Sequence, residues 1–162
     1  MDSVPISQFL ETTYPSPPVP LSTEWGSEIE AKARTLIGPV FQSSIMPREM
    51  QILSPRAQEY FRRTREESLG HPLEDLLNPP DKEEKMWAAL EGDLGAVGQM
   101  MQKYSSDGPF INGSNPGYTD FFIAGVLQCA RVVDEGVFER MVNRPGFGDV
   151  YRACLPWMER SN

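Results

Sequence analysis

The chain has 162 residues, of which 40% are hydrophobic, and it carries a formal net charge of −8 at pH 7. This length and composition are ordinary for one soluble globular domain with a real core. Because phosphates attract basic surfaces, the acidic balance argues against nucleic acid and anionic membranes as main partners.

The cysteine and histidine content limits the chemistry that the chain can carry. Its two cysteines, Cys129 and Cys154, and its one histidine, His71, are too few for a zinc site of the usual type. His71 lies in a Gly-His-Pro turn without a nucleophile motif around it, so a serine triad is not indicated. Both cysteines have surroundings typical of small buried side chains. We therefore expect no metal site.

Targeting signals are also not visible in the sequence. The N-terminal segment is acidic and contains prolines, which is unlike a secretory signal. The longest apolar stretch, FFIAGVLQCARVV, is too short to span a bilayer and carries an arginine. We expect a soluble, cytoplasmic protein that does not insert into membranes.

In chain order, the first expected element is a short helix within residues 1–14. Ser3 can cap this helix, and Pro5 is tolerated in its first turn. Its apolar side chains share one face at spacings of three and four: Ile6, Phe9 and Leu10. Residues 15–21 are rich in proline and predict an extended linker.

Residues 22–162 then show helical periodicity almost throughout, and we treat them as one helical domain. A helix is expected from Ser22 or Thr23, and Gly38-Pro39 should kink or interrupt it. The segment SSIMPREMQIL is apolar and rich in methionine but contains Pro47, so its secondary structure is ambiguous. Ser54-Pro55 predicts the start of another helix, which Gly70 should end.

The second half of the chain carries the strongest periodic patterns. After Asp81, apolar residues recur at spacings near 3.6 as far as Tyr104. The segment YTDFFIAGVLQCARVVDEG is apolar nearly all round, which is typical of the central helix of a bundle. Two shorter helices should follow, and no alternating strand pattern is visible. The predicted fold class is all-α, with about five to seven helices in a bundle.

The order of these motifs resembles the glutathione transferase family. Asp2-Ser3 opening a helix, then FLETTYP, a proline linker and a helical bundle match the transition between that family's two domains. PFINGSNPGYTDFFIAGVLQ is similar to a recurrent segment of its second domain, although Gly117 replaces the usual serine or threonine cap. Asp120 is retained and is expected to cap the buried helix as a structural residue. AQEYFRRTREESLG and RPGFGDVYRACLPW look closest to fungal, etherase-related members.

The resemblance implies that residues 1–14 are the last helix of a thioredoxin-like domain, and that residues 22–162 are the helical C-terminal domain. The family's catalytic residue would lie in the preceding part, so the catalytic residue here stays unknown. Glutathione is the implied cofactor, and Asp2 and Ser3 are the implied remnant of its site. A serine hydroxyl and free N–H groups at a helix start suit a carboxylate. The alternative for Ser3 is a plain helix cap.

Three functions follow as hypotheses. The first is a glutathione transferase-like protein that binds hydrophobic small molecules, or conjugates them to glutathione, through a pocket of the helical domain. The second is a fungal secondary-metabolite enzyme without glutathione, such as an isomerase, dehydratase or cyclase, that uses the same pocket. The third is a non-catalytic interaction domain. A homodimer is the expected assembly. The pocket candidates are apolar, adaptable or aromatic side chains: Phe41, Ile45, Met46, Met50, Tyr60 and Tyr118.

Overall fold

A computed structural model of the chain describes residues 3–16, 18–19, 21 and 23–158. The regular elements in this part of the chain are all helical, which confirms the all-α prediction. The first half contains α1 (Ser3–Thr13), α2 (Glu24–Val40), the π-helical turn η1 (Phe41–Ile45), α3 (Met46–Glu49), η2 (Met50–Ile52) and α4 (Pro55–Leu69). The second half contains η3 (Leu73–Leu77), α5 (Lys82–Met101), η4 (Gln102–Tyr104), α6 (Tyr118–Val133), α7 (Glu135–Val142) and α8 (Phe147–Met158).

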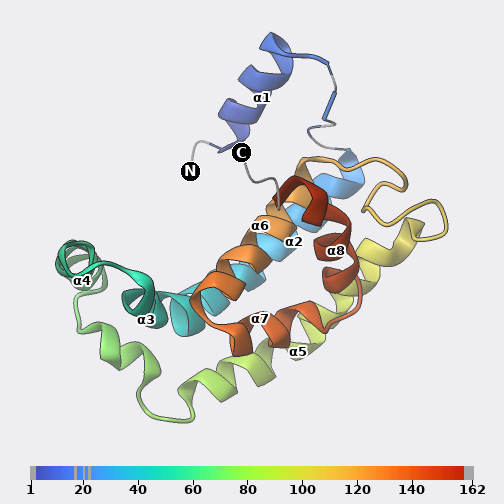
Figure 1. The fold of residues 1–162 in the computed structure, drawn as a ribbon. Helices are drawn as coiled ribbons and strands as arrows, with labels where there is room; N and C mark the ends of the chain where they lie inside the picture. The colour runs from blue at the N-terminus through green and yellow to red at the C-terminus, as the bar shows by residue number, and fades with distance from the viewer. Residues whose placement is uncertain (1–2, 17, 20, 22, 159–162) are drawn as a thin grey trace.

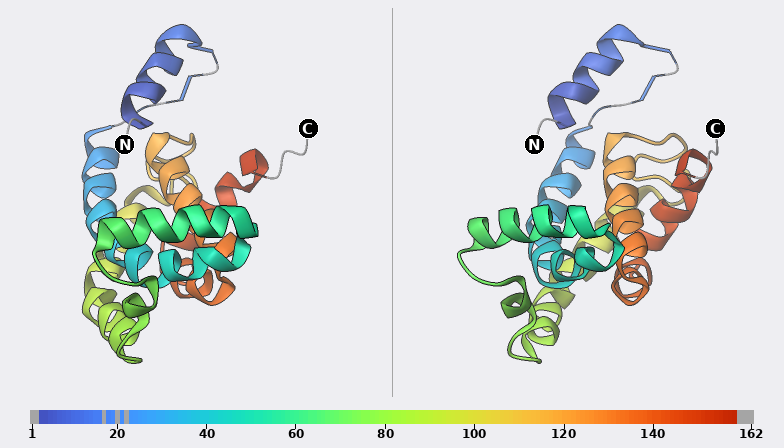
Figure 2. Two further views of the ribbon diagram at one scale, coloured as in Figure 1. Left: turned by 90° about the vertical axis from the view of Figure 1, so that its left-hand side faces the viewer. Right: turned by 60° about the vertical axis from the view of Figure 1, so that its left-hand side comes forward.

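Helix α6 is the centre of the bundle. It packs against α2, α7 and α8, and α2 packs in turn against α5 (Figures 1 and 2). Its inward residues repeat at helical spacing, and Ile123, Ala124 and Leu127 are almost completely buried. An apolar surface that extends round the helix needs neighbours on several sides, which explains the central position.

Helix α2 begins at a well-formed cap and continues through a proline. The Thr23 side chain accepts a hydrogen bond from the backbone N–H of Gly26. The sequence predicted a kink or an interruption at Gly38-Pro39, and α2 continues through Pro39 as far as Val40. Because proline lacks an N–H, the hydrogen-bond pattern changes there, and the π-helical turn η1 follows directly.

Helix α4 lies at one edge of the molecule, away from the bundle (Figure 1). It starts at Pro55 after Ser54 and ends at Gly70, whose φ of 76° lies in the left-handed region. No residue of α4 is fully buried. The side chains of α4 therefore do not join the main core.

Helix α1 also stands apart from the bundle in each view (Figures 1 and 2). The side chain of Glu11 accepts a hydrogen bond from the backbone N–H of Val19, which folds the following segment back along the helix. The apolar side chains of α1 remain exposed: Val4, Ile6, Phe9 and Leu10.

Candidate functional site

The main apolar cavity lies between α2, η1 and α6, with α7 contributing one side chain. Its volume is about 430 Å³, which is within the range of small-molecule sites. The lining residues are predominantly apolar: Arg34, Ile37, Val40, Phe41, Ile45, Tyr118, Phe121, Phe122, Gly125, Val126, Cys129, Ala130 and Met141.

Helical spacing and one glycine create this hollow. Tyr118, Phe122, Gly125 and Cys129 follow one another at intervals of four, three and four residues, so they share one face of α6. A Cβ atom placed on Gly125 would meet nothing within 4 Å. The missing side chain at Gly125 thus leaves open space in the middle of an aromatic wall.

The polar groups of the cavity are few. Arg34 comes from α2, and its guanidinium lies over the ring of Phe122 at 4.1 Å from the ring centroid. Arg34 also donates to the carboxylate of Glu30, at 2.9 Å from Nε and 2.7 Å from Nη2. Tyr118 contributes a half-buried phenol at the start of α6. An apolar hollow with a few fixed polar groups can bind a hydrophobic molecule in a defined orientation.

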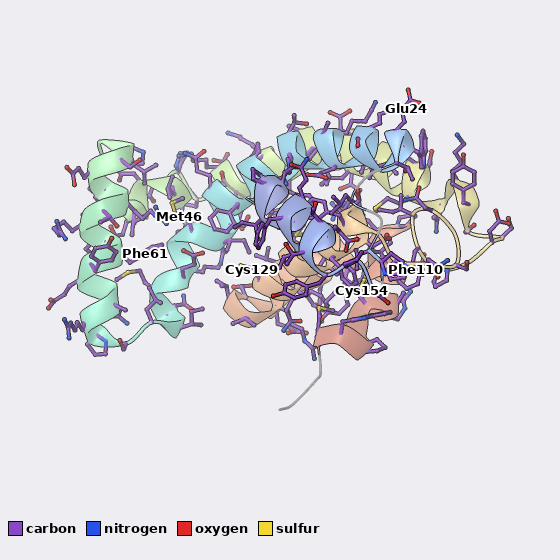
Figure 3. All side chains as sticks on the ribbon, turned by 90° about the horizontal axis from the view of Figure 1, so that it is seen from above. Glu24, Met46, Phe61, Phe110, Cys129 and Cys154 are labelled. Carbon is purple, nitrogen blue, oxygen red and sulfur yellow. The ribbon has the colours of Figure 1, made fainter. Side chains whose placement is uncertain are left out.

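Cys129 lines this cavity and also a second one of about 380 Å³. The second cavity lies between α6, η2 and α4, and Phe61 lines it from the side of α4 (Figure 3). Burial, followed by the nearby carboxylate of Glu49, raises the pKa of the Cys129 thiol. Burial also raises the pKa of Cys154, to about 12. Both thiols are therefore protonated at neutral pH, and neither is an activated nucleophile.

The structure separates the pocket candidates into two groups. Phe41, Ile45 and Tyr118 line the main cavity. Met46 and Met50 belong to the following α3 and η2 segments, and neither lines the main or the second cavity. Tyr60 is 64% exposed on α4. The stretch after Ile45 stays next to α6, but it borders the second cavity there, through Glu49, Ile52 and Leu53.

Several wall residues were not among the sequence candidates: Arg34, Phe122, Gly125 and Cys129. The periodicity of the central helix contained a signal for three of them, because they share the face of Tyr118. Arg34 gave no such signal, since an arginine on an amphipathic helix most often faces solvent.

The structure gives little information on Asp2 and Ser3, the two residues predicted to belong to a glutathione site. Ser3 is the first residue of α1, and nothing is described of its side chain. Asp2 lies outside the described residues. The assignment of both residues to a glutathione site therefore stays a prediction.

Asp120 sits at the third position of α6 and is completely buried. Its Oδ2 accepts a hydrogen bond from the backbone N–H of Gly117 at 2.8 Å, which closes the start of the helix. Its Oδ1 accepts from the N–H of Ile111, also at 2.8 Å. Burial raises the pKa of Asp120, although the backbone donors act in the opposite direction. These contacts tie the preceding loop to the wall that carries Tyr118.

Within the part of the chain that the structure describes, no three His, Cys, Asp or Glu side chains are placed to hold a metal ion. A search of the same residues finds no helix with the length and apolar character needed to cross a membrane.

Comparison with known proteins defines the class to which this fold and cavity belong. The family described as "Glutathione S-transferase, C-terminal domain" matches residues 29–154. The chain therefore belongs to the glutathione S-transferase family through its helical C-terminal domain, which confirms the resemblance seen in the sequence.

Three similar proteins, one known by sequence and two by crystal structure, come from fungi. The glutathione S-transferase-like protein ustS of Aspergillus flavus is 30% identical over 98% of this chain, which spans 61% of that protein. The crystal structure of glutathione transferase GSTFuA3 from Phanerochaete chrysosporium matches with a TM-score of 0.75 and 25% identity, over 97% of this chain and 64% of that one. A glutathione S-transferase of Ceriporiopsis subvermispora, crystallised in complex with glutathione, shares the fold at a TM-score of 0.73 and 23% identity, over 97% of this chain and 64% of that one.

Proposed function

We propose that the chain binds hydrophobic small molecules in the cavity between α2 and α6, as the ligand-binding domain of a glutathione S-transferase-like protein. The observation that carries this proposal is the cavity itself, which is almost wholly apolar and large enough for a small aromatic molecule. Phe41, Phe121 and Phe122 offer aromatic surface for such a ligand.

Glutathione is the co-substrate that we propose for the whole transferase-like protein. The Ceriporiopsis relative was crystallised with glutathione, which supports a glutathione-linked role for the family. Conjugation also requires a group that activates the glutathione thiol. The raised pKa values of Cys129 and Cys154 do not suit either residue to that task. We therefore propose ligand binding as the function of the helical domain, and we test conjugation separately.

Filling the cavity tests the proposal. Gly125→Leu places a side chain into open space on the cavity wall, so it should fold normally and occupy the ligand site. Gly92→Leu is the matched control, because Gly92 also lies within a helix with nothing within 4 Å of a Cβ, but outside the cavity. Both changes remove a helical glycine, which stabilises each variant by up to about 1 kcal/mol.

The measurement is fluorescence titration with the neutral apolar dye N-phenyl-1-naphthylamine. We expect Gly125→Leu to weaken dye binding about tenfold or more, because a loss of about 1.4 kcal/mol of binding free energy raises the Kd tenfold. Gly92→Leu should bind like the wild type. Equal binding by all three proteins would place the dye elsewhere and contradict the proposal. Addition of glutathione and 1-chloro-2,4-dinitrobenzene to the same samples tests conjugation.

A second candidate function is protein interaction, which the exposed apolar face of α1 favours. We propose that a second copy of the chain covers this face in a homodimer. The mass in solution tests the idea: the wild type should have twice the chain mass of 18.2 kDa, and the double variant Ile6→Ser, Phe9→Ser should return to the single mass. A wild-type monomer at micromolar concentration would refute the homodimer.

A further inference from the structure

Arg34 is the one charged side chain among the described residues that line the main cavity. It lies on α2, with about one third of its side chain exposed. A single charge beside an otherwise apolar wall determines which polar group a bound molecule can present there. The net charge of the chain, −8, repels anionic ligands, so attraction of an anion to this cavity depends on the local charge of Arg34.

The geometry leaves part of the guanidinium available. Nε and Nη2 of Arg34 both donate to the same oxygen of Glu30, so the pair uses one edge of the planar group. Nη1 has no acceptor within the described part of the chain. An arginine carries five N–H donors in a fixed fork, so Nη1 can still bind a planar anion while the pair with Glu30 persists.

The surroundings hold the guanidinium in position for such a contact. The guanidinium lies over the ring of Phe122, which is part of the cavity wall, and its Nε and Nη2 edge is held by the nearly buried Glu30, which is 9% exposed. Stacking and the ion pair restrict the side chain before a ligand arrives, which lowers the entropy lost on binding. Arg34 is thus a prepositioned donor at the edge of an apolar hollow.

We propose that the ligand of this cavity is a hydrophobic carboxylic acid, with its carboxylate on Nη1 of Arg34 and its apolar body against the α6 wall. This inference rests on the proposed function, and it adds the polar group that the ligand carries. Charge-assisted hydrogen bonds from arginine to a carboxylate are stronger than neutral ones, so Arg34 selects the acid over a neutral molecule of the same shape.

A matched ligand pair tests the selection by calorimetry at pH 7. 2-Naphthylacetic acid and 2-naphthylacetamide have nearly the same shape and differ in charge. We expect the wild type to bind the acid about tenfold more tightly than the amide, from one charge-assisted hydrogen bond. In Arg34→Met this preference should disappear, with the affinity for the amide retained within about threefold because methionine preserves an apolar stem.

Two further variants control for the unpaired charge of Glu30 and for the general effect of replacing a paired arginine. Arg34→Met leaves the carboxylate of Glu30 without its partner. The double variant Glu30→Gln/Arg34→Met removes both charges, and it should bind the acid and the amide with the same affinities as Arg34→Met. Arg152→Met is the matched control, because Arg152 also pairs with an acid one turn earlier in its helix but lies outside the cavity. It should keep the full preference for the acid.

The outcomes separate this inference from the proposed function. Equal affinities for acid and amide in the wild type, with the neutral dye still bound, would overturn the inference alone. No binding of the dye, the acid or the amide would overturn both. If glutathione displaces the acid from the wild type but not from Arg34→Met, then Arg34 holds a glutathione carboxylate. This outcome would also overturn the inference. Retention of the preference in Arg34→Met would place the selecting group elsewhere and contradict the assignment.

Discussion

Asp120 shows how one residue fixes a helix start and a cavity wall at once. Its carboxylate is fully buried and accepts backbone hydrogen bonds from Gly117 and Ile111. Buried N–H groups without an acceptor are costly, so this side chain satisfies two groups that water cannot reach. The same contacts place Tyr118 and Phe122 on the face that borders the cavity.

Replacement of Asp120 should therefore lower stability strongly. We expect Asp120→Ala to reduce the free energy of unfolding by about 3 kcal/mol, since two buried donors lose their acceptor. Asp120→Asn keeps one acceptor oxygen and should cost roughly half as much. Urea unfolding followed by circular dichroism measures both values. Asp93→Ala, on the exposed face of α5, is the control and should change stability by less than about 0.5 kcal/mol. A cost for Asp120→Ala no larger than that of the control would contradict this role.

At the scale of the elements, Arg48 joins three segments of the bundle. It lies on α3 and donates to both oxygens of Glu83 on α5, at 3.0 and 2.8 Å. Its Nε lies 3.0 Å from the carboxylate of Asp134, which caps α7. It also donates to the carbonyl of Ser44 in η1. The ion-pair network holds the π-helical turn, which contributes Phe41 and Ile45 to the cavity, against α5 and α7.

The titration of Glu83 gives this network a pH dependence. Burial raises the pKa of Glu83, but the hydrogen bonds from Arg48 and Ser44 outweigh it, and the pKa lies below its ordinary value of 4.5. A carboxylate with a lowered folded-state pKa stabilises the fold above pH 4.5 and loses this contribution as the pH falls through the lowered value.

We expect Glu83→Gln to lower the free energy of unfolding by about 2 kcal/mol at pH 7, because Arg48 loses a partly buried partner. The difference from the wild type should shrink below pH 4.5, where Glu83 of the unfolded chain becomes protonated, and it should be lost as the pH falls through the lowered pKa of the folded state. Urea unfolding at several pH values from 7 down to 3 measures both effects. Glu84→Gln is the neighbouring control, with its ion pair to Arg140 more exposed, and should cost less than 1 kcal/mol. A difference that stays constant with pH would exclude titration of Glu83 as the cause.

At the scale of the whole molecule, the chain divides into a packed bundle and an outlying α1. The core includes residues of α2, α5, α6, α7 and α8, whereas the apolar side chains of α1 remain in contact with solvent. Because burial is what makes an apolar side chain stabilising, α1 should contribute little to the stability of the bundle.

This division predicts two contrasting mutations. Phe9→Ser, at a residue that is 65% exposed, should change the free energy of unfolding by less than about 0.5 kcal/mol at a dilution where the chain is monomeric. Leu127→Ala removes a completely buried side chain from α6 and should cost about 3 kcal/mol. Chemical unfolding at matched concentrations compares them. A loss at Phe9 as large as that at Leu127 would mean that α1 packs on the bundle.

Much of the fold could be predicted from sequence because its determinants are local. The all-round apolar pattern of residues 118–133 indicated the central helix, and Ser54-Pro55 and Gly70 marked the limits of α4. The hydrogen bond from Gly117 to Asp120 spans three residues, so a capping pattern could indicate it. The second bond to Asp120, from Ile111, depends on the path of a loop that no short motif specifies.

The sequence by itself therefore determined the helical class, the central helix and the family, since periodicity, caps and motif order are properties of neighbouring residues. Only the tertiary structure decided which side chains face the cavity. Arg34 and Gly125 enter its wall because α2 lies beside α6. Met46, Met50 and Tyr60 lie outside it because their segments, α3, η2 and α4, border the second cavity instead. A cavity is a space between elements, so its lining depends on how the helices pack against one another.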